Sequence, residues 1–205
     1  MLNVPLLPHT LEDMSTARTH FREALSLLSN LIEDEAFISS VDSASKALSS
    51  CLQSGGKILS CGNGGSMSDA MHFAEELSGK FREDRPAYAA IALSSPAHIT
   101  CVANDYGFDK IFSRGVEALG CQGDVLLAIS TSGNSSNVLE AAHAAKSKGM
   151  KVLALTGGDG GELASLSDYE IRIPWDGYSD RVQEMHIKCI HAMIDSIERS
   201  FISFS

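Results

Sequence analysis

A histidine and a glutamate stand four residues apart in a stretch with helical spacing, at His72 and Glu76. Residues four apart share one face of a helix, so the imidazole and the carboxylate can act together. Such a pair can hold a divalent metal ion or transfer a proton. A solvated helix face is the alternative for the pair taken alone. Its position favours chemistry, because it closely follows a glycine-rich loop at the end of a short apolar run.

The last helical stretch carries a second set of candidates, Gln183, His186 and His191. Gln183 and His191 are separated by a rise of ~12 Å and a rotation of ~80° on a straight helix. They line roughly one side but are far apart for one metal ion, unless the side chains lean together or one comes from a neighbouring subunit. His186 is the rival candidate, and spacing alone does not choose between the two histidines.

The glycine-rich loop comes at residues 62–65, between the apolar run Ile58–Cys61 and a helical pattern that starts near Ser66. Glycines let the backbone approach a ligand closely, and Ser66 with Asp69 is typical of a helix start. A plain turn is the alternative. The loop is not G-x-G-x-x-G and no G-K-[ST] follows, so dinucleotide-binding and P-loop interpretations fail.

A second loop, residues 130–136 (STSGNSS), also follows an apolar run and opens a helical stretch. Hydroxyls and backbone N–H groups at a helix start form a phosphate or sulfate site. A cap and turn would need one such residue, and five hydroxyls therefore favour a ligand.

Asn104 and Asp105 could bond sugar hydroxyls, although spacing favours a helix end and turn. Asp180 and Arg181 resemble a capping acid and an ion-pair partner.

The surrounding pattern predicts an α/β protein with a doubly wound, five-stranded parallel sheet of flavodoxin-like type. Strands are expected at 57–61, 88–93, 125–130, 151–156 and 169–173, and helices at 66–80, 96–104, 108–119, 135–148, 160–166 and 179–202. Two extra helices, about 11–35 and 37–52, precede the first strand. We expect them to pack on a partner subunit, with a cap on the chain's own sheet as the alternative. The chain is thus one domain over 1–205, with a helical extension at about 11–54 and an α/β core at about 55–205.

Composition excludes several classes of protein. The 16 basic and 26 acidic residues give a net charge of −10 without a basic cluster, so we expect no nucleic-acid or anionic-membrane surface. Five widely spaced cysteines without C-x-x-C argue against a disulfide framework and a cysteine zinc site. No apolar run approaches the ~20 residues of a membrane span, and the first residues do not resemble a signal peptide. A cytoplasmic location fits best.

Five stretches of the chain carry a resemblance to a known family: CGNGGSMSDAMHFAEELSGKF, CVANDYGFDKIFSR, GDVLLAISTSGNSSNV, KGMKVLALTGGDGG and GYSDRVQEMHIKCIH. From about Leu11 to the last helix the chain resembles the sugar isomerase (SIS) family, and within it the phosphoheptose isomerases. The serine loop marks the wider family, whereas HFAEEL together with RVQEMHIKCIH is more specific. The resemblance implies conversion of sedoheptulose 7-phosphate to D-glycero-D-manno-heptose 7-phosphate, toward the heptose of the lipopolysaccharide core.

The resemblance also implies a cytosolic homotetramer with sites at subunit interfaces and one zinc ion per subunit. The implied zinc ligands are His72, Glu76, Gln183 and His191. The implied substrate contacts are Asn63, Gly64, Gly65, Ser66, His72, Glu76, Asn104, Asp105, Ser130, Thr131, Ser132, Ser135, Asp180 and Gln183.

An aldose–ketose isomerase moves a proton between two neighbouring carbons through an enediol. Glu76 is the candidate base at one carbon, with His191 on the opposite side. Whether Glu76 is a zinc ligand, a base or both in turn stays open.

A relative in the same family binds the bacterial replication initiator without catalysis, so a scaffold is the alternative function. Another phosphosugar isomerase is a further alternative, but such enzymes usually carry extra domains.

Overall fold

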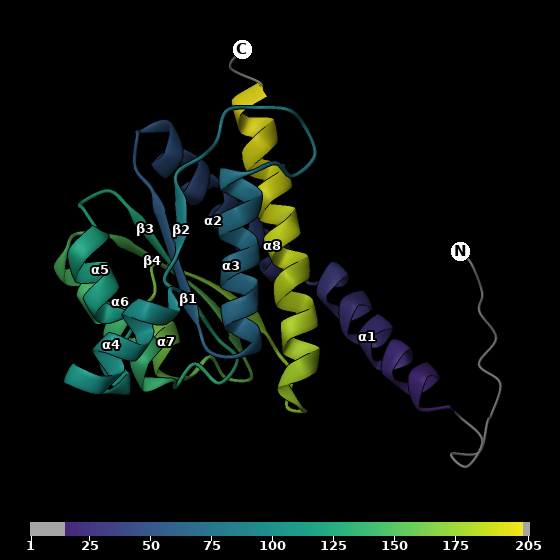
Figure 1. Cartoon of the computed structure of the whole chain (residues 1–205). Coiled ribbons are helices and arrows are strands. Elements are labelled where there is room, and N and C mark those ends of the chain that lie inside the picture. The colour runs from purple at the N-terminus through teal and green to yellow at the C-terminus, as the bar shows by residue number, and fades with distance from the viewer. Residues whose placement is uncertain (1–14, 203–205) are drawn as a thin grey trace.

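The computed structural model describes residues 15–202 as an α/β domain with a long helical arm (Figure 1). The strands are β1 (Ile58–Gly62), β2 (Ala90–Ala92), β3 (Val125–Ser130), β4 (Lys151–Gly157) and β5 (Tyr169–Ile173). The helices are α1 (Thr16–Glu33), α2 (Glu35–Gln53), α3 (Gly65–Ser78), α4 (Pro96–Tyr106), α5 (Ser113–Leu119), α6 (Ser136–Ser147), α7 (Gly161–Leu166) and α8 (Ser179–Ile202), with a 3₁₀ turn, η2 (Phe108–Lys110). Among the described residues, no helix is both long and apolar enough to cross a bilayer.

The five strands form one all-parallel sheet in the order β2-β1-β3-β4-β5. This confirms the predicted flavodoxin-like arrangement. The chain builds the sheet outward from β1 in one direction and from β3 in the other, so the loops after these two strands leave toward opposite faces. In open parallel sheets this switch point is where ligands bind.

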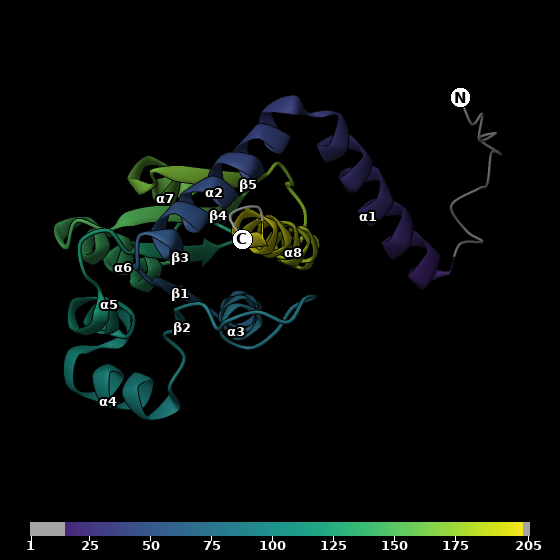
Figure 2. The same cartoon turned by 90° about the horizontal axis from the view of Figure 1, so that it is seen from above.

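Successive residues of each strand supply the cores on the two faces of the sheet. Ile58 and Leu127 belong to the core that includes residues of α2, α3 and α8. Leu59 and Leu126 belong to the core that includes residues of α4 to α7. Figure 2 shows these two helical layers on either side of the sheet. All residues of β1 and β3 are buried, as expected for strands covered on both faces.

The two N-terminal helices differ in their packing. Leu48 of α2 is fully buried in the core of this chain's own sheet, so for α2 the alternative expectation, a cap on the same subunit, is correct. In contrast, α1 projects from the body (Figures 1 and 2). Leu27 and Leu31 anchor its second half in the core, whereas Phe21 and Leu25 are 78% and 65% exposed. The predicted start of this helix near residue 11 lies outside the described residues.

Two expected elements differ in extent. The strand expected at 88–93 is reduced to Ala90–Ala92. The backbone N–H of Tyr88 instead donates to the carbonyl of Leu77 at the end of α3, which ties the preceding segment to the helix. The helix expected at 108–119 is divided into η2 and α5, because the chain turns at Ile111 and Phe112 to bury both side chains.

Candidate active site

The loops after β1 and β3 are joined by a pair of asparagine side chains. The amide of Asn63 donates to the side-chain oxygen of Asn137 at 2.8 Å, and Asn137 returns the same bond at 2.8 Å. Asn137 is 1% exposed and lies at the start of α6. The pair spans the switch point and holds the two predicted ligand loops together. The sequence predicts Asn63 in the site but not Asn137, because no motif marks an amide whose partner lies 74 positions away.

The glycine loop brings the chain from β1 into α3 through a tight turn. Gly64 has φ +55° and precedes the helix without any side-chain cap. Ser66 is buried, and its backbone N–H bonds to the carbonyl of Asn63. The N–H groups of Met67 and Ser68 likewise donate to the carbonyl of Gly64, so the carbonyls of the loop itself, rather than a side chain, cap the start of α3.

Further along α3, the predicted histidine and glutamate meet the second histidine of α8. Nε2 of His72 lies 3.1 Å from Oε1 of Glu76 and 3.4 Å from Nε2 of His191. Ligand atoms of these three residues all lie within 4.8 Å of one another. Figure 1 shows α3 and α8 running side by side, which brings together residues 119 positions apart. We call His72, Glu76 and His191 the central triad.

The surroundings of His191 favour its neutral form. Burial lowers the pKa of the imidazole below its ordinary value, and the neighbouring His72 lowers it further, although Glu76 opposes the shift. The Phe81 ring packs near the same imidazole, with the two ring centroids 5.6 Å apart. A neutral imidazole has a free lone pair on one ring nitrogen, so it can bind a metal ion or accept a proton.

His186, the rival to His191, serves the core. It is fully buried, and its Nε2–H donates to the carbonyl of Thr156 at 2.9 Å. Nδ1 has no hydrogen-bond partner, and burial lowers the pKa of the ring to about 4. Five residues correspond to about 140° around a helix, so His186 faces β4 while His191 faces α3.

Gln183 lies apart from the central triad in this chain. Its amide packs on the backbone of Gly65, where an added Cβ would come within 2.6 Å of the amide oxygen. His72 is seven residues further along α3, a rise of about 10 Å. The structure therefore brings together three of the four predicted metal ligands and places the fourth beside the glycine loop.

The serine loop has the geometry of an anion site. The hydroxyls of Ser130 and Ser135 lie 3.0 Å apart. Ser135 precedes α6 but makes no side-chain capping bond, so N–H groups of the first turn are left without that partner. Gly133 has φ +65°, and a Cβ there would collide with the carbonyl of Gly160. Thr131 and Ser132 line a polar pocket of about 460 Å³ near the start of α8.

The remaining predicted contacts stay local. Asn104 donates to Asp105 at 2.7 Å on the last turn of α4, and Gly107, with φ +90°, ends the helix. This is the helix end and turn that spacing favoured. Asp180 accepts the backbone N–H of Arg181 at the start of α8. Within the described part of the chain, none of the hydrogen bonds of these side chains reaches the central triad.

One further carboxylate lies near the triad, although in the sequence it matches only a helix-capping signal. Asp69 lies one turn before His72 on α3, and its Oδ2 is buried without a hydrogen-bond partner. Burial raises the pKa of Asp69 to about 6, against the opposing effect of His72. Sequence spacing places Asp69 on the same helix as His72. That its Oδ2 has no hydrogen-bond partner depends on how α3 packs, which spacing does not show.

The fold is a doubly wound α/β domain with two candidate ligand loops at its switch point, and comparison with known proteins defines the class. Residues 19–157 match the family model described as SIS domain. The phosphoheptose isomerase of Pectobacterium atrosepticum is 57% identical over 182 residues, which cover 89% of this chain and 94% of that protein.

Solved structures agree with this assignment. The phosphoheptose isomerase of Neisseria gonorrhoeae has a TM-score of 0.83 at 43% identity and covers 89% of this chain and 97% of its own. That of Francisella tularensis has a TM-score of 0.85 at 40% identity, covering 91% and 100%. The chain therefore belongs to the SIS domain family and, within it, to the phosphoheptose isomerases.

Proposed function

We propose that the protein converts sedoheptulose 7-phosphate to D-glycero-D-manno-heptose 7-phosphate, the step that supplies the heptose of the lipopolysaccharide core. The convergence of a carboxylate and two imidazoles from α3 and α8, in a fold that also has a hydroxyl-lined loop after β3, carries the proposal. The alternative, a scaffold that binds the replication initiator, has no need of this triad, and none of the compared relatives described above bears such a name.

A zinc ion, one per subunit, fits the donor set of the central triad. Zinc–nitrogen and zinc–oxygen bonds of about 2.0–2.2 Å place tetrahedral ligands about 3.3–3.5 Å apart. The Nε2 atoms of His72 and His191 lie 3.4 Å apart, and Nε2 of His72 lies 3.1 Å from Oε1 of Glu76. Both separations are close to the spacing expected for zinc ligands. The proposed ligands are His72, Glu76 and His191, with Gln183 supplied by a partner subunit, because Gln183 of this chain lies beside the glycine loop. When bound, the ion would act as a Lewis acid that polarises the sugar carbonyl.

The protein's own groups would move the proton. Glu76 would take the proton from one of carbons 1 and 2, and the pair of carbons would pass through an enediol before a proton returns to the other carbon. His191 lies on the facing helix, and its lowered pKa favours the neutral ring. The lone pair of that ring would hold zinc when the ion is bound, and it would accept or relay the hydroxyl proton only when zinc does not occupy it. Reactant and product are isomers, so no oxidant or reductant is consumed.

The loops would bind and orient the rest of the sugar. Backbone N–H groups at the start of α6, together with serine and threonine hydroxyls, suit the phosphate. Fixing this distant end holds the reacting carbons against the triad and lowers the entropic part of the barrier. The proposed substrate contacts are Asn63, Gly64, Gly65, Ser66, His72, Glu76, Asn104, Asp105, Ser130, Thr131, Ser132, Ser135, Asp180 and Gln183.

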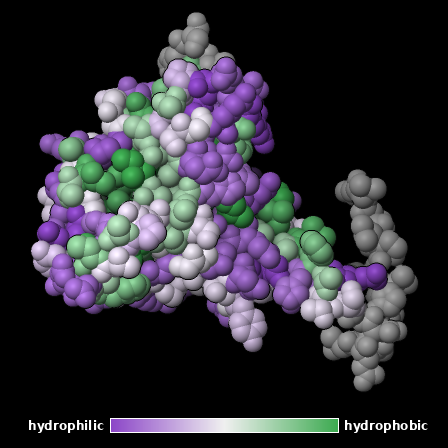
Figure 3. Space-filling model, in the orientation of Figure 1, coloured by the Kyte–Doolittle hydropathy of each residue, from purple (hydrophilic) through white to green (hydrophobic). Residues whose placement is uncertain are grey.

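We place the protein in the cytoplasm as a homotetramer with active sites at subunit interfaces. Support comes from α1, whose exposed Phe21, Leu25 and Ile32 form an apolar strip on the projecting arm. Figure 3 shows hydrophobic side chains along this arm. A monomer rarely leaves such a strip in water. A partner subunit would also bring other side chains to the sites of its neighbour.

Turnover of sedoheptulose 7-phosphate before and after chelation tests the function. We expect the purified protein to isomerise this sugar, to lose activity after dialysis against a chelator, and to recover when zinc is added. Full activity in the chelated protein would contradict the role of zinc. Absence of turnover in a folded, zinc-loaded protein would contradict the isomerase function and favour the scaffold.

A further inference from the structure

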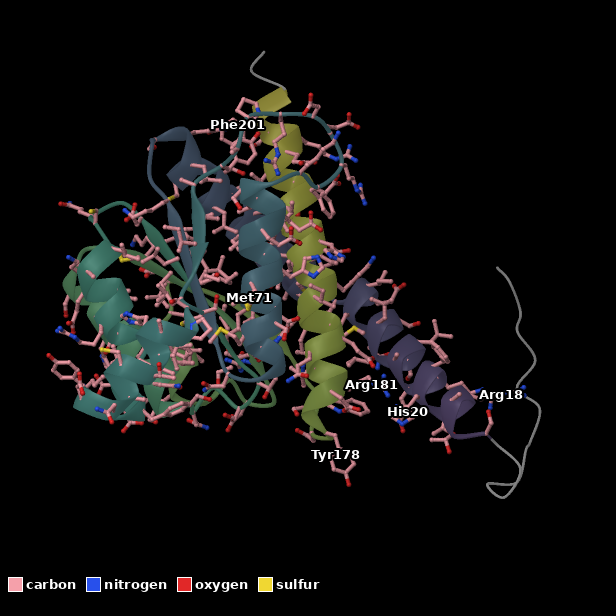
Figure 4. The ribbon with its side chains drawn as sticks, viewed as in Figure 1. Arg18, His20, Met71, Tyr178, Arg181 and Phe201 are labelled. Carbon is pink, nitrogen blue, oxygen red and sulfur yellow. The ribbon has the colours of Figure 1, made fainter. Side chains whose placement is uncertain are left out.

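A buried arginine connects the projecting helix α1 to the first turn of α8. Arg181 is 3% exposed. Its Nη2–H groups donate to Nδ1 of His20 at 3.0 Å and to Oε2 of Glu23 at 3.2 Å, both on α1. Its Nη1 donates to Glu184, one turn further along α8. Figure 4 shows Arg181 and His20 lying against one another where α1 passes the start of α8.

Local helix stability does not explain this arginine. A positive charge in the first turn of a helix opposes the helix dipole, and burial of a guanidinium costs free energy unless several partners compensate it. Here burial lowers the pKa of Arg181, but its bonds to Glu184 and Glu23 outweigh that effect and raise it above the ordinary value. Two of its three partners come from α1, so Arg181 is placed to join two helices.

The position of Arg181 connects this junction to the proposed site. Asp180 precedes it, and Gln183 follows two residues later with its amide against Gly65 of the glycine loop. The planar guanidinium binds groups on both helices at once and so restricts how the first turn of α8 can rotate or shift. The first half of α1 is otherwise mostly exposed. Displacement of α1 would therefore also shift the first turn of α8, which carries Asp180 and Gln183.

We propose that Arg181 is a positioning residue that makes the placement of Gln183 and Asp180 depend on the docking of α1. This inference rests on the proposed function for its catalytic consequence. Because the apolar strip of α1 is exposed in the single chain, a partner subunit that covers it would hold α1 in place. Through Arg181, assembly of the subunits would then fix the positions of Gln183 and Asp180 in the site. Arg181 itself would not contact the substrate.

The test weakens the junction from the α1 side, where both partners are surface residues. In the double variant His20→Ala/Glu23→Gln we expect the KM for sedoheptulose 7-phosphate to rise about tenfold, with a smaller change in kcat. Hydrogen exchange at the amides of residues 183–186 should become faster by about fivefold or more. Thermal stability and oligomeric state should change little. Glu33→Gln, which removes a charge from the same helix outside the junction, is the matched control and should leave both measurements unchanged.

Arg181→Lys gives a second comparison, since lysine keeps the charge but not the two-sided geometry, and we expect it to behave like the double variant. An unchanged exchange rate in the double variant would overturn the proposal, whatever the activity of the protein. So would an unchanged KM in an active protein whose melting temperature alone had fallen, because that is the result of a purely structural ion pair. Absence of turnover in the wild type would refute the proposed function, and the exchange measurement would still decide on the junction.

Discussion

Two histidines five residues apart on α8 lie in opposite environments. His186 faces the sheet, where it is fully buried and donates one hydrogen bond to the carbonyl of Thr156. His191 faces α3, where it meets the imidazole of His72 and the carboxylate of Glu76. Both rings are held neutral by burial. They differ in their neighbours, since one faces a single backbone carbonyl and the other faces groups that can bind a metal ion or exchange a proton.

This difference shows that the face of the helix, rather than the residue type, decides which histidine takes part in chemistry. A helix that lies between a sheet and another helix presents a structural side and a reactive side within one and a half turns. Substitutions on the reactive side, at His191 or at the residues of α3 that it meets, should remove activity and leave the fold intact. Substitution of His186 on the structural side should change stability and leave the activity intact.

The largest effect is expected at Glu76, the acid of the reactive side. Glu76→Gln keeps the size of the side chain but removes the base, and general acid–base catalysis is typically worth about 10²–10⁴-fold in rate. We expect kcat for sedoheptulose 7-phosphate to fall by about this factor, with unchanged circular dichroism and oligomeric state. If the variant retains more than about a tenth of the wild-type kcat, less than about 1.4 kcal/mol of barrier, Glu76 is not the essential base.

Next comes the metal content of three histidine variants. His72→Ala and His191→Gln should reduce bound zinc from about one ion per subunit to near zero, because each removes a ligand of the proposed site. His186→Gln should retain zinc, since its ring bonds to Thr156 on the other face of α8. Elemental analysis of the purified proteins measures this directly. Normal zinc content in the His72 variant would remove that residue from the ligand set, and loss of zinc in the His186 variant would contradict the division between the two faces.

The sequence predicts the helices and strands better than it predicts which of their residues lie together. The strands at 125–130 and 169–173 have the predicted bounds because short apolar runs between turn residues are typical of buried strands. The separation of His186 from His191 around the helix also follows from spacing, but which face meets α3 depends on packing. The resemblance to phosphoheptose isomerases favoured His191, and the structure places that ring beside His72.

For other parts of the site the sequence carries no signal of their tertiary contacts. Asn137 pairs with Asn63 only because the sheet brings the ends of β1 and β3 together. Asp69 matches a capping pattern, and its buried, unpaired oxygen emerges only when α3 packs against the rest of the fold. Long-range partners of this kind depend on the tertiary arrangement, which no local pattern encodes.

The smallest expected effect belongs to the structural side and appears as a dependence of stability on pH. The folded-state pKa of His186 is about 4, against an ordinary value of 6.5. Between these values the unfolded chain binds the proton and the folded protein does not, so the free energy of unfolding should fall as the pH falls from 6.5 toward 4. The shift corresponds to about 3 kcal/mol over this window.

In His186→Gln the amide can still donate to the carbonyl of Thr156 but does not titrate. We therefore expect this variant to lose about 2–3 kcal/mol less stability than the wild type between pH 7 and pH 4. Urea unfolding of the metal-free proteins at both pH values measures the difference. His191→Gln is the matched control on the same helix and should retain most of the acid sensitivity, because its ring is only partly buried. Equal acid sensitivity in the wild type and the His186 variant would mean that the ring on the sheet side is not held neutral by burial.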